Sequence, residues 1–276
     1  MERAPLFNPA EVGKLFRPEG ESKNGQITII GGSELFHGAP LLSLTVASKI
    51  VDMVYFSSPD TSVGEVANNI KSKLFSFIWV PWEDVDKYIE KSDAILMGPG
   101  FMRYRREGQN VQDDAWLHTR KVTQGFLEKY KDKKWVIDAG SLQVLEKDWI
   151  PTGAILTPNK REYSMLFGDI DPVEASKKFN CTIVLKGVVD KVCSNGECVE
   201  VAGGNAGMAK GGTGDTLAGL TVALYAKNEA SLAASCASYI TKTAGDELYG
   251  KVRTNFNADD LAQQVPQVLG RLQEQK

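Results

Sequence analysis

The stretch GGNAGMAKGGTGDTLAG, residues Gly203 to Gly219, passes from a glycine-rich loop directly into a helical pattern. Five glycines fall between positions 204 and 214, so the backbone there can adopt positive φ and approach a bound group closely. Asp215 follows at once, and leucines then recur at i, i+3 and i+7, the spacing of a helix with one buried face. The stretch therefore predicts a loop that ends at a helix N-terminus.

Such a helix N-terminus is a natural binding site for an anion. The backbone N–H groups of Gly212, Thr213 and Gly214 should point outward and the helix dipole adds partial positive charge, so we expect a phosphate there. Asp215 would be repelled by that phosphate unless it has a chemical task, such as accepting a proton from an attacking hydroxyl. The alternative is that Asp215 only caps the helix and the glycines only make a tight turn. The Walker A and dinucleotide GxGxxG patterns are both absent.

Length and composition indicate a globular protein of ordinary type. The chain has 276 residues, of which 42% are hydrophobic and 24% charged, and we expect a single domain over 1–276 with 1–20 as an N-terminal extension. The net charge of −3 gives no electrostatic case for nucleic-acid or membrane partners. No apolar run reaches the length of a membrane span or of a signal peptide, so a cytoplasmic location is expected.

Short apolar strands alternate with helical stretches from residue 26 to residue 187, which is typical of an α/β sandwich with a mostly parallel central sheet. A β-hairpin is predicted near residues 189–201, with Asn195 and Gly196 at its turn. Cys193 and Cys198 flank that turn, so a cross-strand pair is geometrically conceivable. Since a cytoplasmic protein seldom forms disulfides, we expect free thiols there instead.

The segment NAGMAKGGTGDTLAG resembles the signature of the ATP- or ADP-dependent NAD(P)H-hydrate dehydratases, which belong to the ribokinase-like superfamily. Sugar kinases of that superfamily usually show a shorter GAGD, and the hydroxymethylpyrimidine and hydroxyethylthiazole kinases usually carry Cys where Asp215 stands. The resemblance continues through GGSELFHGAPLL, TAGDELY and ADDLAQQVP, in that order along the chain. It implies a ribokinase-like α/β/α sandwich and a stand-alone dehydratase domain.

The resemblance also implies a site with three groups of residues. The catalytic residues would be Asp215, as the base, and Gly212, Thr213 and Gly214, as amide donors. The nucleotide-binding residues would be Lys186, Gly187, Val188, Val189, Asp190, Asn205, Met208 and Gly214. The substrate-binding residues would be Ala39, Gly98, Gly100, Asp138, Asn159, Gly207 and Asp215, with Asp138 holding either substrate or a metal-bound water. The basic run of Arg103, Arg105 and Arg106 either meets substrate phosphates or is a solvated loop.

Two segments depart from the family pattern on the substrate side. The family usually has Asp-Ala-Asp-x-Leu after its fifth strand, and Gly140 replaces the second Asp here. The family's Thr-Pro-His-x-Gly-Glu is matched by a segment with Asn159 for His and Arg161 for Gly. Glu162, which is retained, could equally be an acid favoured by the dipole in the first turn of a helix.

The implied activity is dehydration of (S)-NADHX or (S)-NADPHX, the hydrated cofactors, to NADH or NADPH. The ring hydroxyl would be phosphorylated by ATP or ADP with Mg²⁺, and phosphate would then be eliminated. Relatives often form tetramers or larger assemblies, so a homo-oligomer is expected. Two alternatives stay open: a kinase of the same superfamily acting on a sugar or vitamin-precursor alcohol, and a non-catalytic nucleotide-binding protein. The sequence selects neither ATP over ADP nor NADHX over NADPHX.

Overall fold

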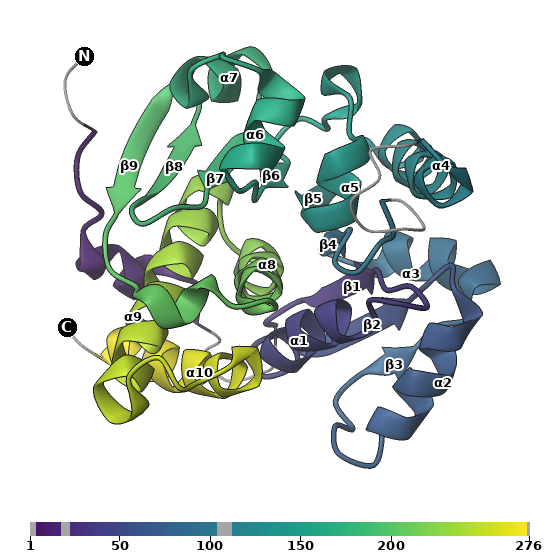
Figure 1. Cartoon of the computed structure of the whole chain (residues 1–276), viewed down its shortest axis with the longest axis horizontal. Coiled ribbons are helices and arrows are strands. Elements are labelled where there is room, and N and C mark those ends of the chain that lie inside the picture. Colours follow the sequence, from purple (N-terminus) through teal and green to yellow (C-terminus); the bar gives the residue numbers. More distant parts are fainter. Residues whose placement is uncertain (1–3, 18–22, 104–111, 275–276) are drawn as a thin grey trace.

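A nine-stranded sheet runs through the part of the chain that the structure, a computed structural model, describes: residues 4–17, 23–103 and 112–274 (Figure 1). Its strand order is β3-β2-β1-β4-β5-β6-β7-β8-β9. The strands are β1 (Gln26–Ile30), β2 (Met53–Ser57), β3 (Ile78–Trp79), β4 (Ala94–Met97), β5 (Lys134–Ile137), β6 (Ile155–Leu156), β7 (Thr182–Leu185), β8 (Asp190–Ser194) and β9 (Glu197–Val201). Neighbours from β3 to β7 are parallel, whereas β7, β8 and β9 are antiparallel. The predicted mostly parallel sheet and its hairpin are confirmed.

Helices cover both faces of the sheet. They are α1 (Gly38–Ala47), α2 (Thr61–Ile70), α3 (Val85–Lys91), α4 (Asp114–Lys129), α5 (Ala139–Val144), α6 (Lys160–Phe167), α7 (Pro172–Lys178), α8 (Thr213–Tyr225), α9 (Ala230–Val252) and α10 (Ala258–Glu274), with short 3-10 turns at η1 (Pro9–Lys14), η2 (Trp82–Asp84), η3 (Lys147–Trp149) and η4 (Ala206–Ala209). One apolar core lies between the sheet and α1, α8, α9 and α10, and a second lies between the sheet and α3 to α7.

Strand β4 shows why both cores form. Its alternate residues Ala94 and Leu96 belong to the first core, whereas Ile95 and Met97 belong to the second. A strand that is buried on both faces must be apolar at every position, and β4 is fully buried along its length. The continuous apolar runs in the sequence are therefore a direct consequence of the two helical layers.

The chain builds the sheet outward in one direction from β1 to β3 and in the other direction from β4 onward, so the connections reverse between the neighbouring strands β1 and β4. In open α/β sheets, the connections that follow two neighbouring strands at such a reversal lead to opposite faces of the sheet. A crevice then forms beyond the carboxyl ends of these two strands. Here the Gly32 N–H donates to the Pro99 carbonyl at 2.8 Å, so the loops after β1 and β4 touch at their bases. Helix α1 begins beside this point, and it carries Ala39 to the edge of the crevice.

Helix α8 begins at a residue that only glycine can occupy. Gly212 is the N-cap with φ +91°, and a Cβ there would lie 2.5 Å from Leu42 and 2.7 Å from Ala258. The Ser43 hydroxyl of α1 donates to the Asp215 carbonyl at 2.7 Å. These contacts hold the first turn of α8 against α1.

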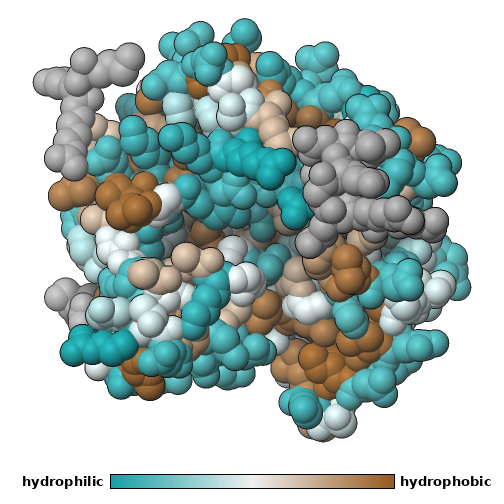
Figure 2. All heavy atoms as spheres, viewed as in Figure 1, coloured by the Kyte–Doolittle hydropathy of each residue, from teal (hydrophilic) through white to brown (hydrophobic). Residues whose placement is uncertain are grey.

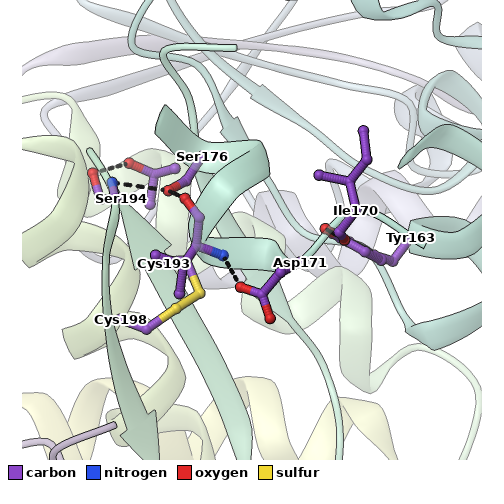
Figure 3. The surroundings of a disulfide bond; sticks show 10 residues. Tyr163, Ile170, Asp171, Ser176, Cys193, Ser194 and Cys198 are labelled. Atoms are coloured by element: carbon purple, nitrogen blue, oxygen red, sulfur yellow. Dashed lines mark hydrogen bonds between the residues drawn. A yellow bond between two sulfur atoms is a disulfide. The ribbon is translucent and has the colours of Figure 1, made fainter. Parts of the chain in front are cut away.

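The hairpin carries a disulfide between Cys193 and Cys198, shown in Figure 3. The prediction of free thiols is therefore wrong for this pair, while Cys181 and Cys236 are free and buried. The two-residue turn explains the difference, since it makes the cysteines direct partners with a Cα–Cα distance of 4.1 Å. Side chains lie closest together in the non-hydrogen-bonded pairs of an antiparallel ladder. The expectation of free thiols considered only the redox state of the cytoplasm and gave too little weight to this proximity.

Candidate functional site

Two cavities adjoin at the first turn of α8. The first, of about 490 Å³, lies beside the loop that follows β7 and beside α9. The second, of about 570 Å³, lies beside the start of α1 and the ends of β4 and β5. Residues that line both are Lys186, Met208, Ala209, Thr213 and Gly214. Figure 2 shows a hollow near the centre of the molecule's face, close to where Figure 1 places α8.

The shared wall of the two cavities is suited to an anion. The first backbone N–H groups of α8 have no acceptor within the helix. A Cβ added to Gly214 would lie 3.4 Å from the Lys186 Nζ, so the ammonium sits over this first turn. The Thr213 hydroxyl donates to the carbonyls of Met208 and Lys210 at 2.7 and 3.0 Å, so it holds the loop. The remaining donors, the amides and the ammonium, point to a phosphate.

Asp215 lines the second cavity from the first turn of α8. The helix is capped by Gly212, so the alternative in which Asp215 serves as the cap is not supported. Burial raises the pKa of Asp215 to about 7; the Asp138 carboxylate adds to the rise, and the Lys186 ammonium opposes it. A carboxylate with such a pKa can accept a proton near neutral pH.

Asp138 and Lys186 form an ion pair beside Asp215. The Lys186 Nζ lies 3.1 Å from the Asp138 Oδ1, and the Asp138 side chain is only 2% exposed. Burial opposes the charge on Lys186, but the carboxylates of Asp138, Glu162 and Asp215 outweigh it and raise the pKa of the lysine. The ammonium therefore stays charged next to the anion-binding amides.

The buried carboxylate of Asp190 holds the loop after β7 in place. It accepts hydrogen bonds from the Gly187 N–H at 2.8 Å and from the Ser238 hydroxyl at 2.7 Å, and the Lys242 Nζ lies 3.3 Å away. Gly187 and Val188 line the first cavity with it, and Val188 is 93% exposed. Val189 follows them in the loop but does not line the cavity. Asp190 thus fixes the position of the loop after β7 relative to α9.

Lys242 is a residue of this site that the sequence analysis missed. Its ammonium donates to the carbonyls of Gly187 and Val188, both at 3.1 Å, and of Gly203 at 3.2 Å. It therefore ties the loop after β7 to the glycine-rich loop before α8. The available signal was a lone lysine in the small, apolar stretch ASLAASCASYITKTAG, because a buried lysine needs partners.

Asn205 and Met208 also line the first cavity. The Asn205 amide donates to the Gly245 carbonyl at 2.9 Å and to Asp246 at 3.1 Å, and its oxygen accepts from the Gly207 N–H at 2.9 Å. Asn205 therefore fastens the glycine-rich loop to α9. Met208 lines both cavities.

The structure brings together most, but not all, of the predicted substrate residues. Those that line the second cavity are Ala39, Gly100, Asp138, Asn159 and Asp215. Gly98 and Gly207 do not line it. A Cβ at Gly98 would overlap the Asp138 carbonyl, and one at Gly207 would lie 2.5 Å from the Phe256 ring. Both glycines allow the backbone to pack closely around the site.

The two departures from the family pattern have local structural reasons. A Cβ at Gly140 would lie 2.5 Å from the Phe101 carbonyl oxygen, so no side chain fits there. Asn159 caps α6: its side chain accepts from the Glu162 N–H at 3.0 Å, and Glu162 accepts from the Asn159 N–H at 2.9 Å. The first-turn role considered for Glu162 is thus confirmed as a capping box.

Arg103 and Glu162, which the sequence analysis named, line the second cavity together with Gln143, and the three form a polar chain. Arg103 donates to Gln143 at 3.0 Å, and Gln143 donates to the buried Glu162 at 2.9 Å. Arg105 and Arg106 lie outside the described residues. Phe36 and Phe101 add aromatic surface to the same wall. No spacing in the sequence connects these residues, since they come together only through the sheet.

Comparison with protein-family models matches nearly the whole chain to one family. A family model described as NAD(P)H-hydrate dehydratase matches residues 27–267. The bifunctional NAD(P)H-hydrate repair enzyme Nnr of Methanocaldococcus jannaschii is 37% identical in an alignment 259 residues long, which covers 90% of this chain and 49% of that protein. The ADP-dependent (S)-NAD(P)H-hydrate dehydratase of Nitrosopumilus maritimus is 29% identical, over 93% of this chain and 94% of that protein. The chain spans about half the length of the bifunctional relatives.

Solved structures share the fold. A ribokinase-like superfamily protein of Enterococcus faecalis has a TM-score of 0.81 with 21% identity, and the match covers 98% of this chain and 96% of that one. The ADP/ATP-dependent NAD(P)H-hydrate dehydratase of Bacillus subtilis, co-crystallized with ATP and Mg²⁺, has a TM-score of 0.78 with 22% identity, covering 99% of this chain and 100% of that one. The predicted ribokinase-like sandwich is confirmed.

Proposed function

The chain belongs to the NAD(P)H-hydrate dehydratase family, and from this membership we propose that it dehydrates (S)-NADHX and (S)-NADPHX to NADH and NADPH. ATP or ADP is the phosphoryl donor. The observation that carries the proposal is the position of Asp215, which faces one cavity while the anion-binding turn of α8 is shared by both. The phosphoryl donor in one cavity and the hydroxyl that accepts the phosphoryl group in the other can therefore meet beside Asp215, which acts as the general base.

The donor nucleotide occupies the first cavity, with its terminal phosphate at the amides of Gly212, Thr213 and Gly214. The hydrated nicotinamide ring occupies the second cavity, with its hydroxyl at Asp215. Asp215 accepts the hydroxyl proton as the hydroxyl oxygen attacks the terminal phosphorus. The amides and the Lys186 ammonium stabilise the charge on the phosphoryl group during transfer. Loss of phosphate from one ring carbon and of a proton from the neighbouring carbon then forms the double bond that restores the dihydronicotinamide.

Mg²⁺ is part of the proposal as a companion of the nucleotide. Among residues 4–17, 23–103 and 112–274, no group of three Asp, Glu, His or Cys side chains could hold a metal alone. The carboxylate of Asp138 beside the anion-binding turn nevertheless fits the usual Mg²⁺ environment of one or two carboxylates plus substrate phosphates. When bound, the ion would neutralise phosphate charge.

Cytoplasmic location stays a prediction from the lack of a long apolar run in the sequence, and assembly into a homo-oligomer stays a prediction from the family resemblance. The part of the chain that the structure describes contains no helix that is both long and apolar enough to cross a membrane.

The test is absorbance at 340 nm during incubation of the purified protein with chemically prepared NADH hydrate or NADPH hydrate, Mg²⁺, and ATP or ADP in parallel. We expect a nucleotide-dependent rise and no rise without nucleotide. A flat trace with folded protein would overturn the proposal. Stable phosphorylation of a small alcohol would then identify a kinase, and nucleotide binding without turnover would identify a binding protein.

A further inference from the structure

Arg103 is a cation of the second cavity that the phosphoryl transfer described above does not use. It follows β4 by a short loop, is half-buried, and lines the second cavity but not the first. Its guanidinium donates to the Gln143 side chain on α5 at 3.0 Å. Arg103 therefore stands apart from the wall that the two cavities share at Lys186 and the first turn of α8.

Both the backbone and the side chain at Arg103 are anchored to helices. The Thr119 hydroxyl of α4 donates to the carbonyl of Met102, the residue directly before Arg103. Gln143 accepts a hydrogen bond from the guanidinium and donates to the buried carboxylate of Glu162 at 2.9 Å. Glu162 is itself fixed by the capping box of α6. Arg103 is thus built into the cavity wall, and a freely solvated basic loop does not describe it.

The second cavity has few positive charges to offer a phosphate of the substrate. Its cationic side chains among the described residues are Arg103, Lys186 and Lys210. Lys186 pairs with Asp138 at the shared wall. The Lys210 ammonium donates to the Phe256 carbonyl at 2.6 Å and so holds the glycine-rich loop. Arg103 is bound in this cavity to a neutral amide, and a guanidinium has five N–H donors with which it can also bind an anion.

We propose that Arg103 binds the pyrophosphate of the hydrated cofactor and that Gln143 orients its guanidinium. Hydrated NADH and hydrated NADPH carry a negatively charged pyrophosphate between their two nucleosides. With the ring hydroxyl at Asp215, this pyrophosphate lies away from the shared wall, which the phosphate of the donor occupies. A guanidinium matches two phosphate oxygens in a bidentate geometry. This inference rests on the proposed function, since it assumes that the second cavity takes the hydrated cofactor.

The test is steady-state kinetics of the wild type and Arg103→Gln at saturating nucleotide with hydrated NADH and with hydrated dihydronicotinamide riboside, which has no phosphate. Glutamine removes the charge but keeps a polar amide. We expect the variant to have a KM for hydrated NADH about 10- to 100-fold higher, the effect of losing a charged hydrogen bond, with kcat unchanged. Both proteins should have the same kcat/KM for the riboside. Arg103→Lys should give an intermediate KM, because lysine keeps the charge but cannot bind two oxygens in the same plane.

Arg161→Gln is the matched control. Arg161 is exposed in the first turn of α6 and does not line the second cavity, so loss of its charge should leave the KM for hydrated NADH unchanged. Equal KM values of the wild type and Arg103→Gln for hydrated NADH would overturn this inference alone. An equal loss with the hydrated riboside would also overturn it, since Arg103 would then act on the ring or on the fold. Absence of dehydration of hydrated NADH by the wild type would overturn the proposed function together with the inference.

Discussion

Asp215 owes its proton affinity to residues that are far apart in the sequence. Burial is the main cause of its raised pKa, and the neighbouring charges come from Asp138 after β5, Lys186 after β7 and Glu162 in α6. The residue itself could be singled out from the glycine-rich stretch. Its raised pKa could not be predicted from the sequence, because these charged groups come together only when the sheet and both cavities have formed.

Asp215→Asn should keep the fold and nucleotide binding but lower turnover by about 10²- to 10⁴-fold, the usual effect of losing a general base. The amide cannot accept the hydroxyl proton, while the anion-binding amides of α8 are unchanged. The 340 nm assay at saturating nucleotide measures this loss. Asp259→Asn, which alters an exposed acid in the first turn of α10, is the control. Turnover near that of the wild type would remove Asp215 from the mechanism.

The activity should rise with pH and level off above about 7. Asp215 must be deprotonated to act as the base, and burial holds its pKa at about 7. The pH profile of kcat/KM for the hydrated cofactor reports this ionisation in the free enzyme. A profile that is flat between pH 5.5 and 8.5 would contradict the assignment.

Because its pKa is raised, the ionised Asp215 carboxylate lowers the free energy of unfolding of the protein. The unfolded chain loses this proton near the ordinary value of 3.8, whereas the folded protein keeps it up to about 7. Between those values the folded state binds more protons, so this group lowers stability as the pH rises. Asp215→Asn should therefore exceed the wild type in free energy of unfolding by about 1 to 4 kcal/mol at pH 8. Urea titrations at pH 4 and pH 8 measure the difference, which should nearly vanish at pH 4.

At the scale of elements, the N-cap of α8 depends on a residue that can adopt positive φ. Gly212→Ala should lower the free energy of unfolding by about 1 to 3 kcal/mol, because the backbone is left-handed there and the new Cβ would press on Leu42 and Ala258. Thermal denaturation measures the loss. The control is Gly211→Ala, since a Cβ at Gly211 has nothing within 4 Å and its φ is not positive. Equal stability of the two variants would show that the left-handed cap is not required.

The β8–β9 hairpin offers a test of its disulfide. Replacing Cys193 and Cys198 with alanine should lower the free energy of unfolding by up to about 2 kcal/mol, the contribution expected for a short closed loop. The turn is also held by the Gly196 N–H, which donates to the Ser176 hydroxyl at 3.2 Å, so the hairpin should persist without the disulfide. Urea titrations with and without dithiothreitol measure the effect. Dithiothreitol should destabilise the wild type and leave the double variant unchanged.

The sequence predicted elements well where a local pattern was strong. The hairpin followed from its Asn195-Gly196 turn, and the strands followed from their apolar runs. Helix α5 was missed because it has only six residues, too few to show a helical period, and it begins at Ala139 with φ +47°. Lys242 was missed as well, since its partners belong to loops that lie about 40 to 55 residues away in the chain.

At the scale of the whole molecule, the α/β class was predictable and the strand order was not. The alternation of apolar strands with helices is visible in the amino-acid sequence, whereas the order of parallel strands depends on pairings between distant segments. Knowing that β1 separates β2 from β4 would have located the crevice. Without it, the division of the predicted residues into a nucleotide-binding group and a substrate-binding group rested on the family resemblance alone.

The two adjoining cavities have a kinetic consequence. Each has residues of its own, and they share only the wall made by Lys186, Met208, Ala209 and the first turn of α8, so neither reactant needs to leave before the other enters. Both must be bound at once for the phosphoryl group to pass directly between them. Initial rates measured against one reactant at several fixed levels of the other should therefore give intersecting double-reciprocal lines. Parallel lines would instead mean that the nucleotide first phosphorylates the protein and leaves, and that the second reactant then binds and takes the phosphoryl group.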